Sequence, residues 1–275
     1  MKPRAVAAWS LAAVAMVLLT NNPVYRALIG LVALNFVLAR RRQGIAIGPL
    51  LSILGIFGLF TIAYNPLISH AGVHQVAAIP SQVPGIGGAI TLESMAFGVF
   101  AAVGFVAAAL AVAPLVLVLE PTDLLDVLPR GLHGTGTALA ASLNLVPAVA
   151  RSFSRVREAE ALRGSPRRGP RGLVALLVPV TLTTIESSVS LAEAMEARAY
   201  GSGPRTRRRA SVLGGADVAA IAVAFGAFGL LLGLRLAGAV ADWYPFPSLS
   251  VPGMNPLAVV ACMLLALPPL LSRPR

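Results

Sequence analysis

Six long stretches of the chain are apolar and almost free of charged residues, and they limit what it can fold into. A helix needs roughly 20 residues to cross the ~30 Å core of a bilayer, because each residue adds 1.5 Å. Only 12% of all residues are charged, against roughly 25% in soluble domains. The sequence therefore predicts an all-α polytopic membrane protein with about six transmembrane helices, at residues 5–20, 24–39, 44–68, 89–119, 218–234 and 256–271.

The basic residues lie mainly between and beyond these stretches. All but two of the 22 Lys and Arg residues fall near the start, at 40–42, at 120–211 or at the end of the chain. The positive-inside rule then predicts a multi-pass protein of the cell membrane with both termini cytoplasmic. A net charge of +11 in a soluble protein would suggest nucleic acid, but here the loops carry it. We therefore expect the chain to bind the lipid bilayer and no nucleic acid. The two remaining basic residues, Arg26 and Arg235, are expected to extend their side chains to the membrane surface.

Composition divides the chain into three predicted regions. Residues 1–119 hold four spans, 120–211 form a cytoplasmic region rich in Arg and Glu, and 212–275 hold two spans. Within the second region, residues 172–190 begin with an apolar run, but Pro179 and Glu186 interrupt it and arginines flank it on both sides. A full crossing would place one basic cluster outside, so we expect helices that lie under or partly enter the membrane.

The cytoplasmic region repeats one short pattern. Residues 158–164 and 193–199 both read Glu-Ala-x-x-x-Arg-small, which places Arg163 and Arg198 35 residues apart. The residues before each arginine are good helix formers, and Gly, Ser and Pro follow soon after it. Each arginine is therefore predicted at the carboxyl end of a rigid helix.

This position suits an arginine that binds a partner. Leu191, Ala194 and Met195 precede Arg198 on one helical face, so a guanidinium would end an apolar stripe and could enter a groove with carboxylates at its floor. The alternative is a solvated charge that only complements the helix dipole. The residues alone leave both hypotheses open.

Residues for catalysis are scarce. Gly134-Thr135-Gly136-Thr137 lacks the lysine of a phosphate-binding loop. His70 and His74 have the i, i+4 spacing of helical metal ligands, and with Glu93 they could serve a membrane-embedded metal-dependent hydrolase.

Glu93 and Asp217 stand near the starts of spans, where carboxylates suggest function. Residues 122–129 are expected to form a short amphipathic helix at the membrane surface. We predict no catalytic residue, metal or cofactor, and keep the hydrolase as the alternative.

Several segments together resemble one family. They are Asn65-Pro66-Leu67-Ile68-Ser69-His70-Ala71-Gly72, residues 121–129, residues 143–147 leading to 158–164, and residues 191–201 followed by Arg205-Thr206. In this order they are similar to the transmembrane T component of energy-coupling factor transporters, the group that includes CbiQ and BioN. The resemblance covers most of the chain.

The resemblance implies a function without bond chemistry. It implies that Arg163 and Arg198 end coupling helices that dock into two cytoplasmic ABC ATPase subunits, while the membrane helices hold a substrate-binding S component. ATP hydrolysis is expected in the separate ATPase subunits. The implied coupling residues are two triplets, Leu162-Arg163-Gly164 and Ala197-Arg198-Ala199. Leu162 and Ala199 depart from the usual Ala-Arg-Gly, so the second helix is expected to end at Gly201.

Two questions stay open on the sequence. A permease that moves solute alone would need no ATPase, and uptake by the isolated chain would distinguish it. Under the leading interpretation the S component selects the substrate, so cobalt, nickel, biotin and other vitamins all remain candidates for an importer of this type.

Overall fold

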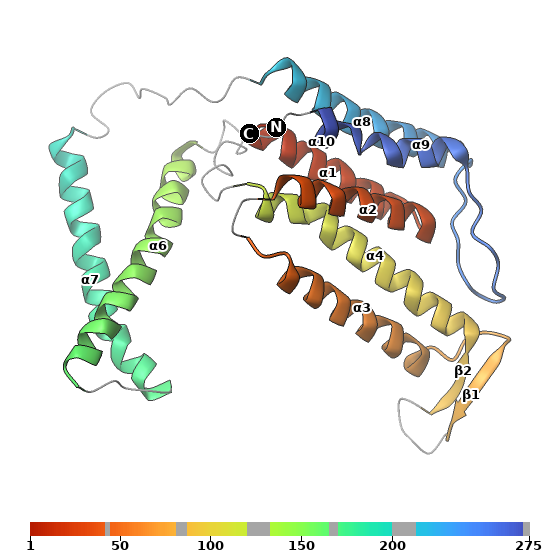
Figure 1. Ribbon diagram of the computed structural model, residues 1–275, viewed down its shortest axis with the longest axis horizontal. Helices are drawn as coiled ribbons and strands as arrows, with labels where there is room; N and C mark the ends of the chain where they lie inside the picture. Colours follow the sequence, from red (N-terminus) through yellow and green to blue (C-terminus); the bar gives the residue numbers. More distant parts are fainter. Residues whose placement is uncertain (42–44, 81–86, 120–132, 165–169, 200–212, 272–275) are drawn as a thin grey trace. The chain divides into compact units, whose positions relative to one another are not determined.

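The computed structural model describes residues 1–41, 45–80, 87–119, 133–164, 170–199 and 213–271. The chain divides into two units, and each is described by itself. Unit 1 comprises residues 1–123 and 212–275, and unit 2 comprises residues 124–211. Both are helical, as the sequence predicted, apart from one small sheet (Figure 1). The predicted amphipathic helix at 122–129 lies outside the described residues.

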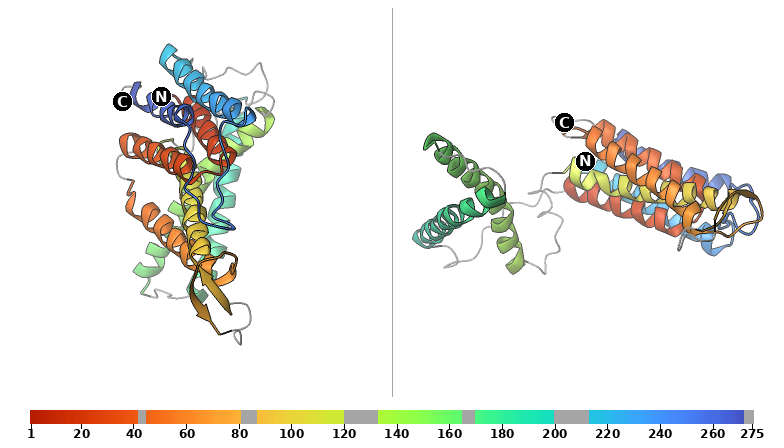
Figure 2. Two further views of the ribbon diagram at one scale, coloured as in Figure 1. Left: turned by 90° about the vertical axis from the view of Figure 1, so that its right-hand side faces the viewer. Right: turned by 90° about the horizontal axis from the view of Figure 1, so that it is seen from below.

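Unit 1 is a bundle of helices that run side by side, as both figures show (Figures 1 and 2). The helix α4 packs against α1, α2 and α3, while α8 packs against α1, α9 and α10. The elements are α1 (Pro3–Leu19), α2 (Pro23–Arg40), α3 (Gly48–Ile68), β1 (Gln75–Ile79), β2 (Gly88–Thr91), α4 (Leu92–Leu117), α8 (Gly215–Leu236), α9 (Pro256–Leu264) and α10 (Leu267–Leu271).

Asparagine and proline set the starts of two of these helices. Asn22 accepts a hydrogen bond from the backbone N–H of Val24, and Pro23 is the first helical residue of α2. Asn255 and Pro256 start α9 in the same way. The side-chain oxygen satisfies one unpaired N–H of the first turn, and proline has no N–H that needs a partner. Residues 20–22 therefore connect α1 directly to α2.

Trp9 lies at the centre of the core of unit 1. Its ring is completely buried and meets Phe36 edge to face, with centroids 4.5 Å apart. Its indole N–H donates to the carbonyl of Leu265 at 2.9 Å. A buried indole needs such an acceptor, so this bond fixes how α9 and the turn after it pack on α1.

Four described helices are long and apolar enough to cross a membrane: α2, α3, α4 and α8. The other two predicted spans correspond to shorter apolar helices, α1 and the stretch Pro256–Pro269. The segment 172–190 falls inside α7 (Pro170–Ala197), which is not among the helices apolar enough to cross. This agrees with the interpretation that it does not span the membrane.

A β-hairpin lies between α3 and α4, whereas the all-α fold predicted from the sequence contained no strand. Its strands β1 and β2 are antiparallel, pair Ala78 with Ala89 and Ile79 with Gly88, and are irregular between Gln75 and Ala77. The short alternating segment Gln75–Ile79 is mostly exposed, so it lacks the apolar face by which strands are usually predicted.

Gly98 permits the close approach of α3 and α4. A Cβ atom at this position would lie 3.0 Å from the carbonyl oxygen of Ile62 and 3.2 Å from its Cα. Because both are backbone atoms, the helices would have to separate. We expect Gly98→Val to lower the free energy of unfolding by about 2 kcal/mol, as overpacking does in other cores. Thermal unfolding of the purified chain measures this, and Gly55→Val, at a site with open space around it, is the control.

Unit 2 consists of α6 (His133–Leu162) and α7, which pack against each other. The helices have 30 and 28 residues, so they extend for about 45 Å and 42 Å at 1.5 Å per residue. They run in opposite directions and cross (Figure 1). Each has one proline in its interior, Pro147 in α6 and Pro179 in α7, and each of these prolines removes one helical hydrogen bond.

Candidate functional site

α6 ends in a tight turn that places Arg163 at its tip. Leu162 is the last helical residue, and the N–H of Arg163 donates to the carbonyl of Ala159 at 3.2 Å. Gly164 follows in a left-handed conformation with φ of +74°, and its N–H donates to the carbonyl of Ala161 at 3.1 Å. Glycine adopts this conformation without steric cost, so it ends the helix directly after the arginine.

α7 ends in the same way, with Arg198 in the place of Arg163. The last helical residue is Ala197, and Ala199 adopts a left-handed conformation with φ of +52°. The N–H of Ala199 donates to the carbonyl of Glu196 at 2.8 Å. The prediction that this helix continues to Gly201 is therefore wrong, because alanine here takes the conformation that glycine takes in the first copy.

The conformation of Ala199 leads to a test. A left-handed conformation costs an alanine roughly 1–2 kcal/mol, and glycine avoids most of that cost. We expect Ala199→Gly to stabilise the end of α7 by about 1 kcal/mol, after the greater freedom of glycine in the unfolded chain is subtracted. Hydrogen exchange of the last turn of α7 measures this. Gly164→Ala should have the opposite effect on α6, and equal exchange in both variants would contradict the argument.

Both tips are accessible. All six residues of the two triplets are exposed, and Leu162 is 89% exposed. Among the described residues, neither the Arg163 nor the Arg198 guanidinium has an ion pair or a side-chain hydrogen bond. Because α6 and α7 run in opposite directions, the two tips lie at opposite ends of unit 2 (Figure 1). Each tip presents a positive charge on a rigid helix.

The predicted apolar approach to Arg198 is present. Leu191 is 52% exposed and Met195 is 37% exposed, and they precede Arg198 by seven and three residues. Both lie on the helical face that leads to the arginine. An aliphatic strip that ends in a guanidinium can bind a groove that is apolar along its length and acidic at its end.

The crossing of α6 and α7 is polar. A cleft of about 680 Å³ lies between the helices, and six of its lining residues are polar or charged: Ser152, Arg155, Thr183, Glu186, Ser187 and Ser190. The hydroxyl of Ser187 donates to the carbonyl of Thr183 at 2.7 Å, and that of Thr183 donates to Val180 at 3.0 Å. Both hydroxyls therefore form their hydrogen bonds with backbone carbonyls of α7.

The histidines proposed as metal ligands do not share a helix. α3 ends at Ile68, and His70 and His74 lie in the non-helical segment that leads into β1. The Nδ1 atom of His70 lies 3.3 Å from the carbonyl of Ala89, and that of His74 lies 2.7 Å from Oε1 of Glu93. In the described part of the chain, no group of three His, Cys, Asp or Glu side chains could hold a metal. The interpretation that both imidazoles lie on one helical face as metal ligands is therefore wrong.

Glu93 instead fastens the segment before the hairpin to α4. Its side chain is fully buried and also accepts the backbone N–H of His74, at 3.3 and 3.2 Å from its two oxygens. Thr91 caps α4 and donates to the carbonyl of Ala71 at 2.6 Å. Gly72 has φ of +134°, and a Cβ there would lie 2.5 Å from Oε2 of Glu93. Because glycine has no Cβ, the backbone at Gly72 can approach the carboxylate of Glu93 this closely.

Asp217, the other carboxylate near the start of a span, also has a structural role. It is buried at the start of α8 and accepts the backbone N–H of Gly214 at 3.2 Å, as a helix-capping residue does. Its other oxygen accepts the backbone N–H of Lys2 at 2.9 Å. Asp217 thus connects the start of α8 to the start of α1.

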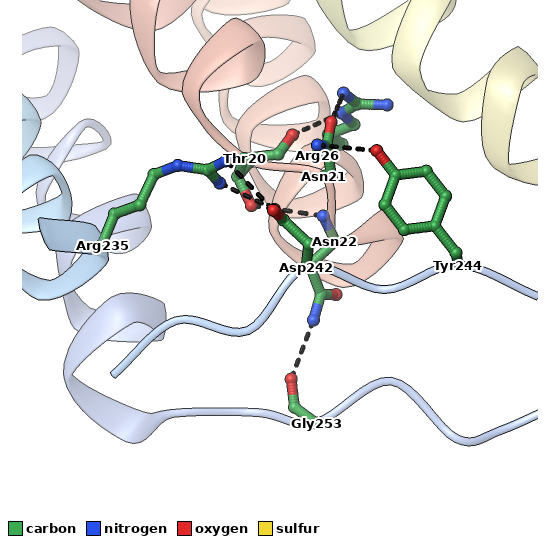
Figure 3. A network of polar contacts seen from close by, with 8 residues as sticks. All are labelled: Thr20, Asn21, Asn22, Arg26, Arg235, Asp242, Tyr244 and Gly253. Atoms are coloured by element: carbon green, nitrogen blue, oxygen red, sulfur yellow. Dashed lines mark hydrogen bonds and ion pairs between the residues drawn. The ribbon is translucent and has the colours of Figure 1, made fainter. Parts of the chain in front are cut away.

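The two isolated arginines of the membrane helices belong to a network of polar contacts (Figure 3). Arg26 donates from Nε to the carbonyl of Thr20 at 2.8 Å and from Nη2 to Oδ1 of Asn21 at 2.9 Å. Arg235 forms a bidentate pair with Asp242, at 2.8 and 3.2 Å. Sequence analysis expected only arginines that reach the membrane surface, because it could not show which loop supplies their partners.

The segment between α8 and α9 closes over one end of unit 1. Tyr244 accepts a hydrogen bond from Asn21 at 3.2 Å, and the carbonyl of Gly253 accepts one from Asn22 at 2.8 Å (Figure 3). Trp243 lies 5.8 Å from the ring of Phe100, measured between centroids. These contacts join the segment to α2 and α4.

Comparison with known protein families identifies the family of this chain. A family model described as CbiQ, cobalt transport protein, matches residues 1–209. The match includes both arginine triplets and the apolar helices α1 to α4. No curated protein matches the chain.

Proposed function

Because the chain belongs to the CbiQ cobalt transport protein family, it is a membrane component of a transporter, and we propose that it is the T component that couples ATPase movement to import. In this role Arg163 and Arg198 dock into grooves on two cytoplasmic ABC ATPase subunits. The membrane helices of unit 1 hold a separate S component that binds the substrate.

The observation that carries the proposal is the matched ending of α6 and α7. Each helix stops at the residue before an exposed arginine, and each arginine is followed by a left-handed residue, Gly164 or Ala199. The helices run in opposite directions, so each tip can reach a different copy of a partner (Figure 1). If each arginine were only a solvated charge, neither the repeated sequence pattern nor the matched ending of the two helices would be needed.

The mechanism follows from the stiffness of these helices. When the two ATPase subunits close on ATP, the grooves that hold the tips approach each other. Helices of about 45 and 42 Å carry that displacement from the tips to their crossing. There, small polar side chains such as Ser152 and Ser187 line the cleft between the two helices, and this cleft leaves room for the helices to change their angle. The chain transmits force, and the ATPase subunits hydrolyse ATP.

In this proposal the S component, and not this chain, binds and selects the substrate. The family description names cobalt, so Co²⁺ is the first substrate to measure. Nickel, biotin and other vitamins remain candidates because the proposed coupling site does not contact the substrate.

Reconstitution tests the proposal. The chain would be placed in proteoliposomes alone, with two ATPase subunits, and with both ATPases and an S component, and ATP-driven uptake of ⁵⁷Co²⁺ would be followed. We expect uptake only in the complete complex. Uptake by the chain alone would identify it as a permease and contradict the proposal, as would full activity of ATPases and S component without it.

A further inference from the structure

The middle of α7 contains a proline that weakens the helix. Pro179 lies well inside the helix, which begins at Pro170 and ends at Ala197. Proline has no N–H, so the carbonyl of Ala175, four residues earlier, loses its helical partner, and the proline ring presses against that carbonyl. Sharp bends of helices occur mainly at prolines in such positions.

Five hydroxyls follow Pro179 and bind the backbone of their own helix. Each donates to a carbonyl three or four residues earlier, at 2.7–3.0 Å: Thr181 to Leu177, Thr183 and Thr184 to Val180, Ser187 to Thr183, and Ser188 to Thr184. Such bonds compete with the helical N–H for the carbonyl, so they destabilise a helix slightly and favour bending. After Pro147 in α6, Ser154 alone makes a bond of this kind among the described residues 148–156.

The last turns of α7 have the opposite composition. From Leu191 to Ala197 the helix contains only Leu, Ala, Glu and Met. Leu, Ala, Glu and Met are among the strongest helix formers. The segment that leads to Arg198 is therefore stiff, whereas the middle of the helix is weak.

The cleft leaves space beside the weak segment. Thr183 and Ser187, which bind back to the helix, also line the cleft of about 680 Å³ between α7 and α6. Close-packed side chains resist a change in the direction of a helix. Fewer such side chains oppose bending at this cleft than at a tightly packed crossing.

We propose that α7 contains a hinge at residues 175–188, which separates a root segment (170–174) from a stiff tip segment (189–197). The hinge itself is a property of this chain, and its use in transport rests on the proposed coupling function. When the Arg198 tip is displaced, the tip segment changes direction at the hinge and the root segment keeps its own. The stiff tip segment still transmits the displacement to the crossing of the two helices.

Hydrogen exchange of the purified full-length chain tests whether the hinge exists. After correction for the intrinsic rate of each amide, we expect the hinge to exchange at least about threefold faster than residues 189–195. This order is distinctive, because residues 189–195 lie nearer the end of the helix, where helices normally open first. Slower exchange in the hinge than in residues 189–195 would overturn the proposal.

Substitutions at Pro179 test what causes the opening. Pro179→Ala restores the N–H that binds Ala175 and introduces the strongest helix former, so the hinge should exchange roughly tenfold more slowly. Pro179→Gly also restores the N–H but leaves the backbone free, so its exchange should fall between the two. Pro147→Ala in α6 is the matched control and should leave the hinge unchanged. Unchanged exchange in the Pro179→Ala variant would also overturn the hinge.

Uptake tests whether the hinge is used. In the complete complex, the Pro179→Ala chain should bind the ATPases as the original chain does but reduce ATP-driven uptake at least about fivefold, since bending is part of the movement. Pro179→Gly should retain about half of the uptake or more. Normal uptake with Pro179→Ala, or equal loss in both variants, would overturn this role. Absence of ATPase binding to the original chain would instead contradict the proposed function and leave the exchange result intact.

Discussion

Reversing the charge at both helix tips, with Arg163→Glu and Arg198→Glu, is expected to abolish co-purification of the chain with its ATPase subunits. Both side chains are exposed and neither guanidinium binds another described residue, so the substitutions remove no hydrogen bond or ion pair with the described part of the chain. In the proposed complex each guanidinium pairs with carboxylates in a groove, and loss of a buried interfacial charge pair costs about 2–5 kcal/mol. Reversal adds repulsion, so we expect at least about a hundredfold weaker binding.

The single variants should behave differently from the double variant. With two tips on one chain, the second tip binds at a high effective concentration once the first is bound. Arg163→Ala or Arg198→Ala alone should therefore leave a measurable fraction of complex, while the double substitution should leave almost none. Uptake should fall sharply in each single variant, because transmission needs both tips. Affinity purification and uptake measured on the same preparations separate binding from coupling.

Arg157 provides the matched control for both experiments. It is an exposed arginine on α6, six residues before the Arg163 tip, but it does not end the helix. Arg157→Glu changes the net charge by the same amount as either reversal. Unchanged assembly and uptake in the double tip variant would refute the coupling role. Equal losses in the Arg157→Glu variant would show a general effect of charge.

Much of the fold could be predicted because a membrane restricts the choices of a chain. Uncharged stretches of about 20 residues that span it are helical, because a helix satisfies its backbone hydrogen bonds within a single segment in lipid. Local signals also worked where one short segment contains all the relevant atoms. The arginines at the ends of α6 and α7 are of this kind.

The errors arose where contacts between distant residues decide the conformation. His70 and His74 have helical spacing, but His74 lies in a non-helical segment, where it binds Glu93 of another element. Ala199 was not expected to replace glycine, because intrinsic preference opposes a left-handed alanine and only the surrounding turn stabilises it. Arg235 and Asp242 pair across the end of α8, which the sequence gives no means to infer.

The second large effect is expected at Glu93. Glu93→Ala leaves the backbone N–H and the ring nitrogen of His74 without their acceptor and opens a cavity at the start of α4. A hydrogen bond to an ionised group is roughly twice as strong as a neutral one, so several strong interactions disappear together. We expect backbone amides of residues 72–79 to exchange at least about tenfold faster in the purified chain, as expected for local opening of the hairpin. Glu93→Gln, which keeps the shape but not the charge, should have an intermediate effect.

The same experiment distinguishes this structural role from a role in metal chemistry. Asp242 is the control, because it is also paired with a cation but its side chain is 40% exposed, so Asp242→Ala should change local exchange very little. A metal-dependent hydrolase would need Glu93 for activity, and its loss would leave the hairpin protected when no metal is bound. If Glu93→Ala exchanges as slowly as the original chain in the presence of a chelator, the structural assignment fails. Rapid exchange under those conditions would show that Glu93 fastens the hairpin to α4.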